Sequence, residues 1–535
     1  MADKGSHILP DDVQRMLGKD AQRNNILAAR ILAETVKTTL GPKGMDKMLV
    51  NSASGDIIVT NDGVTILEEM DIEHPAAKMI VEIARTQEDE VGDGTTTAVM
   101  LVGKLLENAE KLLDQKIHPT VIAKGYRLAT EMSMQFLREQ AFEISTEEEL
   151  LKVAQTAMTG KGAEYVKEKF DDIIVNAIKV VAEDGKVNLD NIKIEKQKGH
   201  SVEDSELIKG IVLDHERVSS EMPKIVNDAR IALVDCSLEV KTPEAQTSIS
   251  VSSPSQLHEF LEQEENYLRN LVNKIKEVGA NLVICQRGID EMAQYFLAKN
   301  GIYALRRIAK SDMEKLAMAT GARIVSNIKD MSSQDLGYAR VVEELKRSGV
   351  GMTYVRDCKN PKSLTILIRG GTDHVIDEIE RALKDGLGDV AATLESSLVV
   401  AGGGAVEMEL SRKLKEYSKS VQGRESLAIA EFANALEFIP LTLAENAGLD
   451  PIDVLTELRA SHESGNGNDG LNLFTERIEN TLDKGIIEPL KIKTQAISSA
   501  SEISTMILRI DDVIASSAGK KPGHDLDNLR QGLGE

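Results

Sequence analysis

The sequence predicts a multidomain protein that combines α-helical and α/β domains, with one domain inserted into another. Three observations lead to this fold class. The chain has 535 residues, and roughly 100–200 residues per domain leaves room for about three domains. Hydrophobic residues make up 41% and charged residues 28% of the chain, which is typical of globular proteins. Helical patterns at both ends flank a region in which short apolar runs alternate with helices.

The N-terminal part, from Asp20 to about Gln140, has the pattern of long helices. Asn24 to Thr39 is rich in Ala, Ile and Leu, and Ala98 to Leu113 repeats apolar residues at helical spacing. One β-branched interruption, residues 56–63, ends in a turn signal and predicts a hairpin strand that carries its polar residues to one end. The same helical pattern returns from Gly402 to the C-terminus.

Between about Lys209 and Gly370 the pattern predicts an α/β layer. Within this region, Ser311 followed by Glu314 fits a capping box at the start of a helix, and Gly321 fits the C-terminal stop of the same helix. The candidate strands are Ile231–Val234, Leu282–Cys285, Arg323–Val325 and Leu364–Ile368.

Two shorter stretches, about 141–208 and 371–401, mix helix with short strands and flank the α/β region. They would have to lie side by side if the two outer helical parts form one domain. The order of segments is then A-B-C-B-A, a nested insertion.

The segment from Thr242 to Val278 has two interpretations that the pattern leaves open. Thr242 to Ser255 is rich in Ser, Thr and Pro, and a helical pattern follows. One interpretation is a loop followed by an ordinary core helix. The other is a protruding arm whose apolar stripe serves a partner. The apolar residues on one face are Leu257, Phe260, Leu261, Leu268, Leu271, Val272 and Ile275.

Composition and charge exclude several classes of function. The chain has 87 Asp and Glu against 64 Lys and Arg, a formal net charge of −23, which would repel the phosphate backbone of a nucleic acid. No run approaches the roughly 18–20 apolar residues of a membrane span, so we expect no membrane partner and a cytoplasmic location. Cys236, Cys285 and Cys358 show no paired spacing, so we expect reduced, largely buried thiols.

The strongest functional signal is a candidate phosphate site at the start of the 98–113 helix. Gly92-Asp93-Gly94-Thr95-Thr96-Thr97 directly precedes that helix, so free backbone N–H groups and threonine hydroxyls are available to an anion at its N-terminus. Glycines let the backbone approach a phosphate closely, and Asp93 could hold the Mg²⁺ that accompanies a nucleotide. The alternative is a merely well-capped helix, because Asp and Thr are common N-caps.

Other glycine turns are weaker signals. Thr39–Gly44 and Gly402–Ala405 are ordinary turn punctuation when taken alone. The spacing of glycines over 465–470 matches a dinucleotide fingerprint by letter, but it follows a helical pattern and no strand, so we reject it. The sequence also has no Gly-x-x-x-x-Gly-Lys-Ser/Thr run. A nucleotide would therefore bind without a P-loop.

Two further carboxylates are candidates for phosphate chemistry. Asp62 and Asp385 could orient a water and hold a metal beside a nucleotide. On composition alone the favoured interpretation of each is a turn residue or a solvated helix residue, and Lys161 by itself would be a surface lysine in a turn.

Five motifs, in this order and over essentially the whole chain, resemble those of a chaperonin subunit. They are Thr39–Gly44, Asn61–Gly63, Gly92–Thr97, Gly402–Ala405 and Asn446–Pro451. The 242–278 insertion, Thr159–Gly162 and Glu488–Lys491 are similar to the group II branch, and the full-length pattern most resembles the archaeal thermosome.

The resemblance implies three domains. A mostly helical equatorial ATP-binding domain would comprise residues 1–143 and 402–535. A small mixed α/β intermediate hinge domain would comprise residues 144–213 and 370–401. An α/β apical domain would comprise residues 214–369, with a helical lid protrusion at about 242–278.

The resemblance also implies roles for individual residues. Asp93 would bind Mg²⁺, Asp385 would activate the hydrolytic water, and Asp62 would be its catalytic partner near the γ-phosphate. Lys161 resembles the group II lysine that senses the γ-phosphate. The implied ATP-binding residues are Leu40, Gly41, Pro42, Gly94, Thr95, Thr96, Thr97, Thr159, Gly160, Lys161, Gly403, Gly404, Asn472, Glu488 and Lys493.

The implied function is that of an ATP hydrolase coupled to protein folding. Identical or homologous subunits would form a double ring around non-native client proteins, and ATP would close and reopen a built-in lid. One alternative is a metabolic phosphotransferase, although the middle domain shows no polar cluster for an acceptor. A ring-forming holdase that barely hydrolyses ATP is the other. Gly386 and Gly388 follow Asp385 and could cost roughly 1 kcal/mol each inside a helix, which would hold Asp385 less rigidly.

Overall fold

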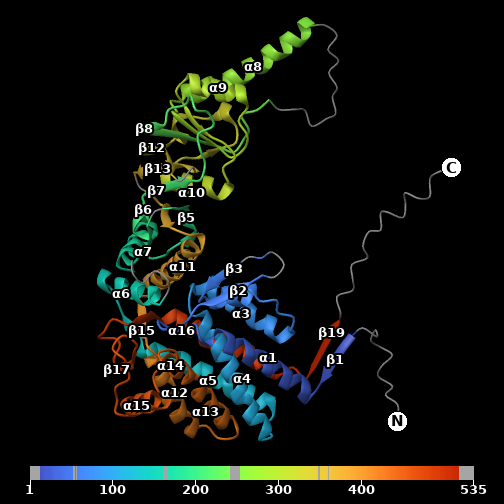
Figure 1. Ribbon diagram of the computed structural model, residues 1–535, viewed down its shortest axis with the longest axis vertical. Helices are drawn as coiled ribbons and strands as arrows, with labels where there is room; N and C mark the ends of the chain where they lie inside the picture. The colour runs from blue at the N-terminus through green and yellow to red at the C-terminus, as the bar shows by residue number, and fades with distance from the viewer. Residues whose placement is uncertain are drawn as a thin grey trace, which may run out of the picture.

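The computed structural model describes residues 13–51, 55, 57–160, 167–199, 201–240, 254–347, 350–359 and 361–516. The molecule is elongated, and a helical body, a middle unit and an α/β unit follow one another along its long axis (Figure 1). The chain starts in the helical body, passes through the middle unit into the α/β unit, and returns through the middle unit to the helical body (Figure 1).

Two stretches far apart in the sequence build the helical body. Their apolar side chains form one continuous core, and Tyr126 meets Phe432 edge to face at 5.5 Å between ring centroids. The N-terminal stretch supplies α1 (Lys19–Lys37), α2 (Gly63–Glu69), α3 (Pro75–Val91), α4 (Thr95–Asp114) and α5 (Pro119–Gln140). The C-terminal stretch supplies α12 (Ala405–Ser420), α13 (Glu425–Leu436), α14 (Phe438–Asn446), α15 (Pro451–Glu463) and α16 (Leu490–Leu508).

Short strands close the helical body at its edges. The predicted hairpin strand is confirmed, because β2 (Lys47–Val50) pairs antiparallel with β3 (Ile57–Thr60). The chain then leads through Asn61 and Asp62 directly into α2. The other small sheets pair β1 (Val13–Leu17) with β19 (Asp512–Ser516), β15 (Leu398–Ala401) with β4 (Phe142–Glu143) and β18 (Ile487–Pro489), and β16 (Asp469–Asn472) with β17 (Arg477–Asn480).

The middle unit packs helices against a sheet of three strands. Its helices are α6 (Glu147–Met158), α7 (Lys167–Val181) and α11 (Asp373–Ser396), with 3-10 turns at Leu189–Asn191 and Val202–Asp204. The sheet order is β5 (Ile192–Lys198), β14 (Leu364–Gly370) and β6 (Glu206–Ile208). The strand predicted at 364–368 exists, but its expected place in the α/β layer is wrong. It pairs with β5 and β6 and adds Leu364, Ile366 and Ile368 to the core of the middle unit.

A seven-stranded sheet forms the α/β unit, and an apolar core covers each of its faces. The strands predicted at 231–234, 282–285 and 323–325 are confirmed, whereas the long antiparallel pair β12 and β13 was not predicted. The strands are β7 (Gly210–Leu213), β8 (Ile225–Val234), β9 (Leu282–Cys285), β10 (Tyr303–Leu305), β11 (Ile324–Val325), β12 (Gly337–Arg347) and β13 (Val350–Cys358). The helices are α8 (Pro254–Glu277), α9 (Glu291–Lys299) and α10 (Lys310–Thr320), with 3-10 turns at Ile328–Asp330 and Ser333–Asp335.

The start of α10 differs from the prediction. The N-cap residue is Ala309, which has no side-chain hydrogen bond to the helix, so Ser311 lies inside the first turn and the expected capping box is wrong. The predicted stop is confirmed, because Gly321 caps the helix with φ of 75°.

Helix α8 projects beyond the body of the α/β unit (Figure 1). Its C-terminal half packs into the core through Leu268, Val272 and Ile275, whereas Phe260 is 38% and Leu261 54% exposed nearer its free end. The apolar stripe is thus buried at one end and exposed at the other. The Ser/Thr/Pro-rich residues 242–253 lie outside the described residues, as does the side chain of Leu257.

The longest apolar helical stretch of the described residues is a core segment. Among the described residues, one helical stretch, Glu425–Asn446, is long and apolar enough to cross a membrane, but 67% of its most apolar window is buried. This is typical of a core helix.

The three cysteines are free thiols, as expected. Cys236 is half-buried, and Cys285 and Cys358 are buried. Burial raises the pKa of Cys285 and that of Cys358 to about 12.

Candidate active site

A cavity of about 420 Å³ lies where the middle unit meets the helical body. This volume falls in the range of small-molecule sites. The cavity brings together every predicted site residue that the structure describes, whereas Lys161 lies outside the described residues. These residues are Leu40, Gly41, Pro42, Asp62, Asp93, Gly94, Thr95, Thr96, Thr97, Thr159, Gly160, Asp385, Gly403, Gly404, Asn472, Glu488 and Lys493.

The N-terminus of α4 opens into this cavity. Gly94 is the N-cap, adopts φ of 81° and gives the helix no side-chain cap. The N-cap residue therefore gives the first-turn N–H groups no side-chain partner of its own, which is compatible with an anion site at this helix start. Gly94 is also required sterically, because a Cβ there would lie 2.7 Å from Cγ2 of Ile492. The Gln87 side chain fixes the preceding residue by donating to the carbonyl of Asp93 at 2.9 Å.

The three carboxylates predicted for the metal and for catalysis reach the cavity from three different segments. Asp62 caps α2, and its Oδ2 accepts hydrogen bonds from the N–H and the hydroxyl of Thr65 at 2.9 and 2.5 Å. Asp93 directly precedes the start of α4, and Asp385 lies on α11 with 7% of its surface exposed. Asp389, 3% exposed, also lines the cavity. Sequence reasoning missed Asp389, although its position one helical turn after Asp385 puts both on one face.

The glycines that follow Asp385 do not interrupt α11, which is continuous from Asp373 to Ser396. A Cβ on Gly388 would lie 2.7 Å from the carbonyl oxygen of Val91 and 3.1 Å from Cα of Gly92. Glycine at this position lets α11 approach the turn that leads to Asp93. The structure thus gives Gly388 a packing role, and the looser hold on Asp385 stays a prediction.

Loops from both units close the rim of the cavity. Gly160 adopts φ of 80°, and a Cβ there would lie 2.4 Å from Cα of Pro42. Asn446 fixes the 40–42 loop, because its Nδ2 donates to the carbonyls of Lys37 and Leu40 at 3.0 and 2.9 Å. This contact gives a structural reason for the Asn446–Pro451 motif, which local pattern alone could not supply.

The Gly402–Ala405 loop forms another wall. Gly403 and Gly404 adopt φ of 65° and 78°, and a Cβ on Gly403 would lie 2.7 Å from the carbonyl oxygen of Leu471. The glycine spacing over 465–470, rejected above as a dinucleotide fingerprint, ends in a glycine that packs against this loop. Gly470 follows α15 and lies against Gly402, where a Cβ would lie 2.7 Å from the carbonyl oxygen of Gly402.

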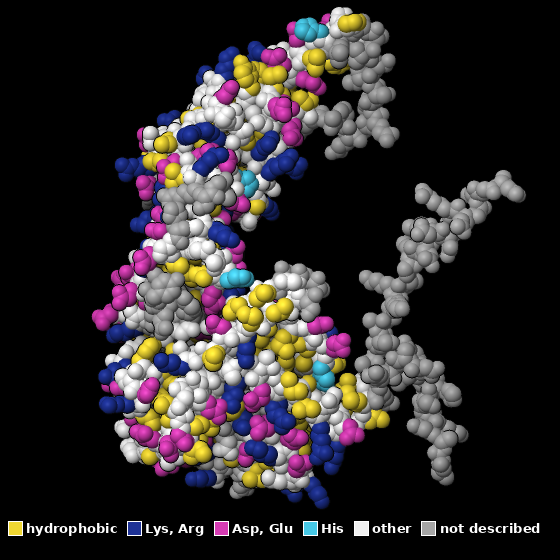
Figure 2. Space-filling model, viewed as in Figure 1, with side chains coloured by type: hydrophobic (Ala, Val, Ile, Leu, Met, Phe, Trp, Pro, Cys, Tyr) yellow, Lys and Arg dark blue, Asp and Glu magenta, His cyan; other side chains and the backbone are white. Residues whose placement is uncertain are grey.

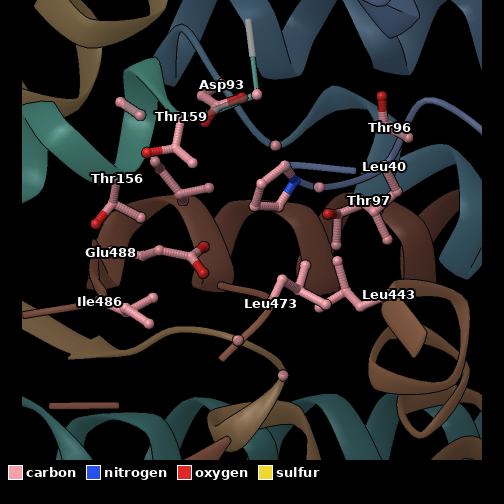
Figure 3. Close-up of a pocket in the computed structure, with 18 of the residues that line it drawn as sticks. Leu40, Asp93, Thr96, Thr97, Thr156, Thr159, Leu443, Leu473, Ile486 and Glu488 are labelled. Atoms are coloured by element: carbon pink, nitrogen blue, oxygen red, sulfur yellow. The ribbon is translucent and has the colours of Figure 1, made fainter. Parts of the chain in front are cut away.

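Polar and apolar side chains share the lining of the cavity. In Figure 3, Thr156, Thr159, Glu488 and Ile486 lie on the side of Asp93, and Leu40, Leu443 and Leu473 lie together with Thr96 and Thr97 on the other. Ile439, Leu471 and Ile492 add further apolar lining. Such a mixed lining suits a ligand that has charged groups and a flat apolar part.

Glu488 and Lys493, which both line the cavity, belong to a buried ion cluster. Nζ of Lys493 lies 2.8 Å from Oε1 of Glu407 and 2.6 Å from Oε2 of Glu488. Burial acts to lower the pKa of Lys493, but the two carboxylates outweigh burial and raise this pKa above its usual range. Lys493 is therefore a cation, and it fixes the side chain of Glu488. Asn472, which also lines the cavity, is fixed within the β16–β17 hairpin, because its Nδ2 donates to Oε1 of Glu479 at 2.6 Å.

The donor set suits Mg²⁺ bound together with a phosphate. Within the described ranges no three His, Cys, Asp or Glu side chains gather as a ready-made metal cluster. Mg²⁺ in phosphate-transfer sites is commonly held by one or two carboxylates and by the substrate phosphates. Asp93, beside the uncapped start of α4, offers such a carboxylate.

Comparison with known proteins agrees with this geometry. The family model described as the TCP-1/cpn60 chaperonin family matches residues 32–518. A thermosome subunit of Methanopyrus kandleri is 58% identical over 515 residues, which cover 95% of this chain and 94% of that protein. Thermosome subunit beta of Methanothermobacter thermautotrophicus is 58% identical over 522 residues, with coverages of 98% and 97%. A thermosome subunit of Pyrococcus horikoshii is 57% identical over 520 residues, with coverages of 96% and 94%. These matches confirm the resemblance inferred from the five motifs, and the chain belongs to the TCP-1/cpn60 chaperonin family.

Proposed function

We propose that the chain is a subunit of a cytoplasmic, double-ring chaperone that uses ATP hydrolysis to enclose non-native proteins. One observation carries the proposal. The cavity joins the uncapped N-terminus of α4, in the helical body, to Asp385, in the middle unit. A family of ATP-dependent chaperonins and a phosphate-type cavity shared by two units point to the same activity.

We assign the helical body as the equatorial domain, the middle unit as the intermediate domain and the α/β unit as the apical domain. The boundaries follow those expected from the sequence, residues 1–143, 144–213, 214–369, 370–401 and 402–535, with two adjustments. The pairing of β14 with β5 and β6 supports an intermediate domain that resumes near Leu364. The pairing of β7 with β13 supports an apical domain that begins near Gly210.

In the proposed reaction, the N–H groups and hydroxyls at the start of α4 bind the phosphates of ATP. The apolar part of the cavity lining receives the base. Mg²⁺ held by Asp93 would neutralise phosphate charge during the reaction. Asp385 orients the attacking water and accepts its proton, with Asp62 beside it. Because Asp385 lies on α11, hydrolysis requires the middle unit to be closed on the helical body.

Exposed apolar side chains support contacts with other subunits and with clients. On the β2–β3 hairpin, Met48 is 67%, Val50 59% and Ile57 45% exposed, and Figure 2 shows hydrophobic side chains gathered in this region of the helical body. On α9 of the α/β unit, Met292 is 42% and Tyr295 50% exposed. Patches of this kind are typical of interaction surfaces.

Native mass measurement with a client-refolding assay tests the proposal. Two stacked rings of about sixteen to eighteen chains would give a mass near 1 MDa, and refolding of a denatured client should require Mg²⁺-ATP. A monomer or dimer whose ATP turnover rises only when a small metabolite is added would contradict the proposal and would indicate a phosphotransferase.

A further inference from the structure

Arg381 links the middle unit to the helical body next to the cavity. It lies on α11 with 22% of its side chain exposed, and its Nη2 donates to the carbonyl of Val59 in β3 at 3.2 Å. Oε2 of Glu378 holds the same guanidinium, at 2.8 Å from Nη2 and 3.3 Å from Nε. The contact therefore joins α11 to a hairpin that lies 322 residues earlier in the chain.

Both ends of this contact lead directly to a carboxylate of the cavity. Along α11, one helical turn of about 5.4 Å separates Arg381 from Asp385 on the same face. Along the hairpin, the chain runs from Val59 through the fully buried Thr60 to Asp62. The N–H of Asp62 donates to Oγ1 of Thr60 at 3.1 Å, which fixes the path between them.

A second hydrogen bond crosses the same junction. Nδ2 of Asn61 donates to the carbonyl of Gly160 at 3.1 Å. Asn61 precedes Asp62 in the helical body, and Gly160 follows α6 in the middle unit. The turn that carries Asp62 is thus bonded to two different segments of the middle unit.

We infer that Arg381 is a positioning residue for ATP hydrolysis, whose bond to Val59 fixes Asp385 relative to Asp62 while the middle unit is closed. The inference rests on the proposed function. Arg381 is not among the residues that line the cavity, so it acts through α11 and not on the nucleotide. Arginine suits the task, because its planar fork bonds a carboxylate and a carbonyl at the same time.

The test measures steady-state ATP hydrolysis and ADP affinity of the assembled protein for Arg381→Ala and Arg381→Lys. Lys384→Ala is the matched control, since Lys384 lies on the same helix, is 56% exposed and pairs with Glu380. We expect Arg381→Ala to lower kcat about tenfold while KM and ADP affinity change by less than about twofold, which is the signature of an interaction made on the way to the transition state. Arg381→Lys should restore part of kcat, and Lys384→Ala should leave it unchanged.

Amide hydrogen exchange of residues 57–62 tests whether the bond from Arg381 to Val59 is made in solution, and the split between kcat and KM tests the positioning role. The exchange should become faster in Arg381→Ala and stay unchanged in Lys384→Ala. A kcat of Arg381→Ala within about twofold of the wild type, or an equal loss in the control, overturns the inference. If Arg381→Ala does not assemble, Glu378→Gln is measured in its place. We then expect Glu378→Gln to lower kcat without raising KM. An unchanged kcat in Glu378→Gln would overturn the inference. A wild type without ATP turnover would instead reject the proposed function.

Discussion

His462 and Glu409 form a buried ion pair behind one wall of the cavity. Nδ1 of His462 lies 2.9 Å from Oε2 of Glu409, and Nε2 lies 2.8 Å from the carbonyl oxygen of Asp469. Both of these partners are hydrogen-bond acceptors. Asp469 begins β16, whose Leu471 and Asn472 line the cavity. The pair therefore supports the cavity wall.

This pair predicts an acid-sensitive stability. Burial acts to raise the pKa of Glu409, but hydrogen bonds from His462 and Arg412 outweigh it and lower this pKa from 4.5 to about 2. A lowered carboxylate pKa stabilises the folded state fully above about pH 4.5, and the stabilisation is lost as the pH falls toward about 2. We expect Glu409→Gln to flatten the pH dependence of the urea midpoint in this window. Glu416→Gln, whose side chain is 77% exposed, is the control, and an equal pH dependence in wild type and Glu409→Gln would contradict the account.

Single residues differ in how far the sequence predicts them. Glycines at tight turns are predictable, because Gly41, Gly94 and Gly404 adopt the positive φ that their motifs demand. Asn446 was noticed only as part of a motif, because its partners Lys37 and Leu40 lie some 400 residues away, at separations of 409 and 406. Local pattern carries no information about such distant contacts.

At the scale of elements, α11 depends on close packing rather than on helix propensity. Gly388 faces the Val91–Gly92 turn, so the helix comes within backbone contact of the segment that leads to Asp93. A side chain at this position would separate the two segments. The proposed catalytic carboxylate Asp385, three residues earlier, would move with the helix.

This packing predicts a loss of activity for Gly388→Ala. Alanine is intrinsically better than glycine inside a helix by about 1 kcal/mol, yet here its Cβ would lie 2.7 Å from the carbonyl oxygen of Val91. We expect a lower kcat for ATP hydrolysis, by about tenfold or more, and no rise in melting temperature. Gly371→Ala is the control, because a Cβ there would meet nothing within 4 Å. A more stable and fully active Gly388→Ala protein would show that the contact is dispensable.

Elements with a strong local pattern were predictable, and elements defined by distant partners were not. The apolar run of β9 gave a strand with the predicted bounds. The strands β12 and β13 show no regular alternation of charged and apolar residues, and their pairing with β8 and β7 is what makes them part of the sheet. The strand β14 was assigned to the wrong layer for the same reason, since its partners come from residues 192–208.

At the scale of the whole molecule, ion pairs join the middle unit to the α/β unit. Nζ of Lys193 in β5 lies 2.9 Å from Oδ1 of Asp312 in α10, and both side chains are largely buried. Arg356 in β13 reaches Glu206 in β6 at 3.5 Å, and Arg369 in β14 holds the same Glu206 from within the middle unit at 2.9 Å. Separating Lys193 from Asp312 would leave uncompensated charge in a largely buried place, which is costly. We therefore expect these two units to move together relative to the helical body.

The nested order of the chain was inferred from changes of local pattern, and its domain boundaries stay a prediction. The position of the cavity could not be derived in that way, because Asp62, Asp93 and Asp385 come from three separate segments. The residues alone made each of them a candidate for phosphate chemistry, and the family resemblance assigned them to one site. Physical pattern predicted the phosphate site at α4, and resemblance added the partner from α11.

The most direct test of the central claim, that the two units share one hydrolytic site, compares ATP binding with ATP turnover in Asp385→Asn. The variant keeps the shape of the side chain but removes its charge. The account predicts that Asp385→Asn binds Mg²⁺-ATP with an affinity within about threefold of the wild type, while single-turnover hydrolysis falls by about a hundredfold or more. Hydrolysis at the wild-type rate in a variant that binds ATP normally would contradict the account.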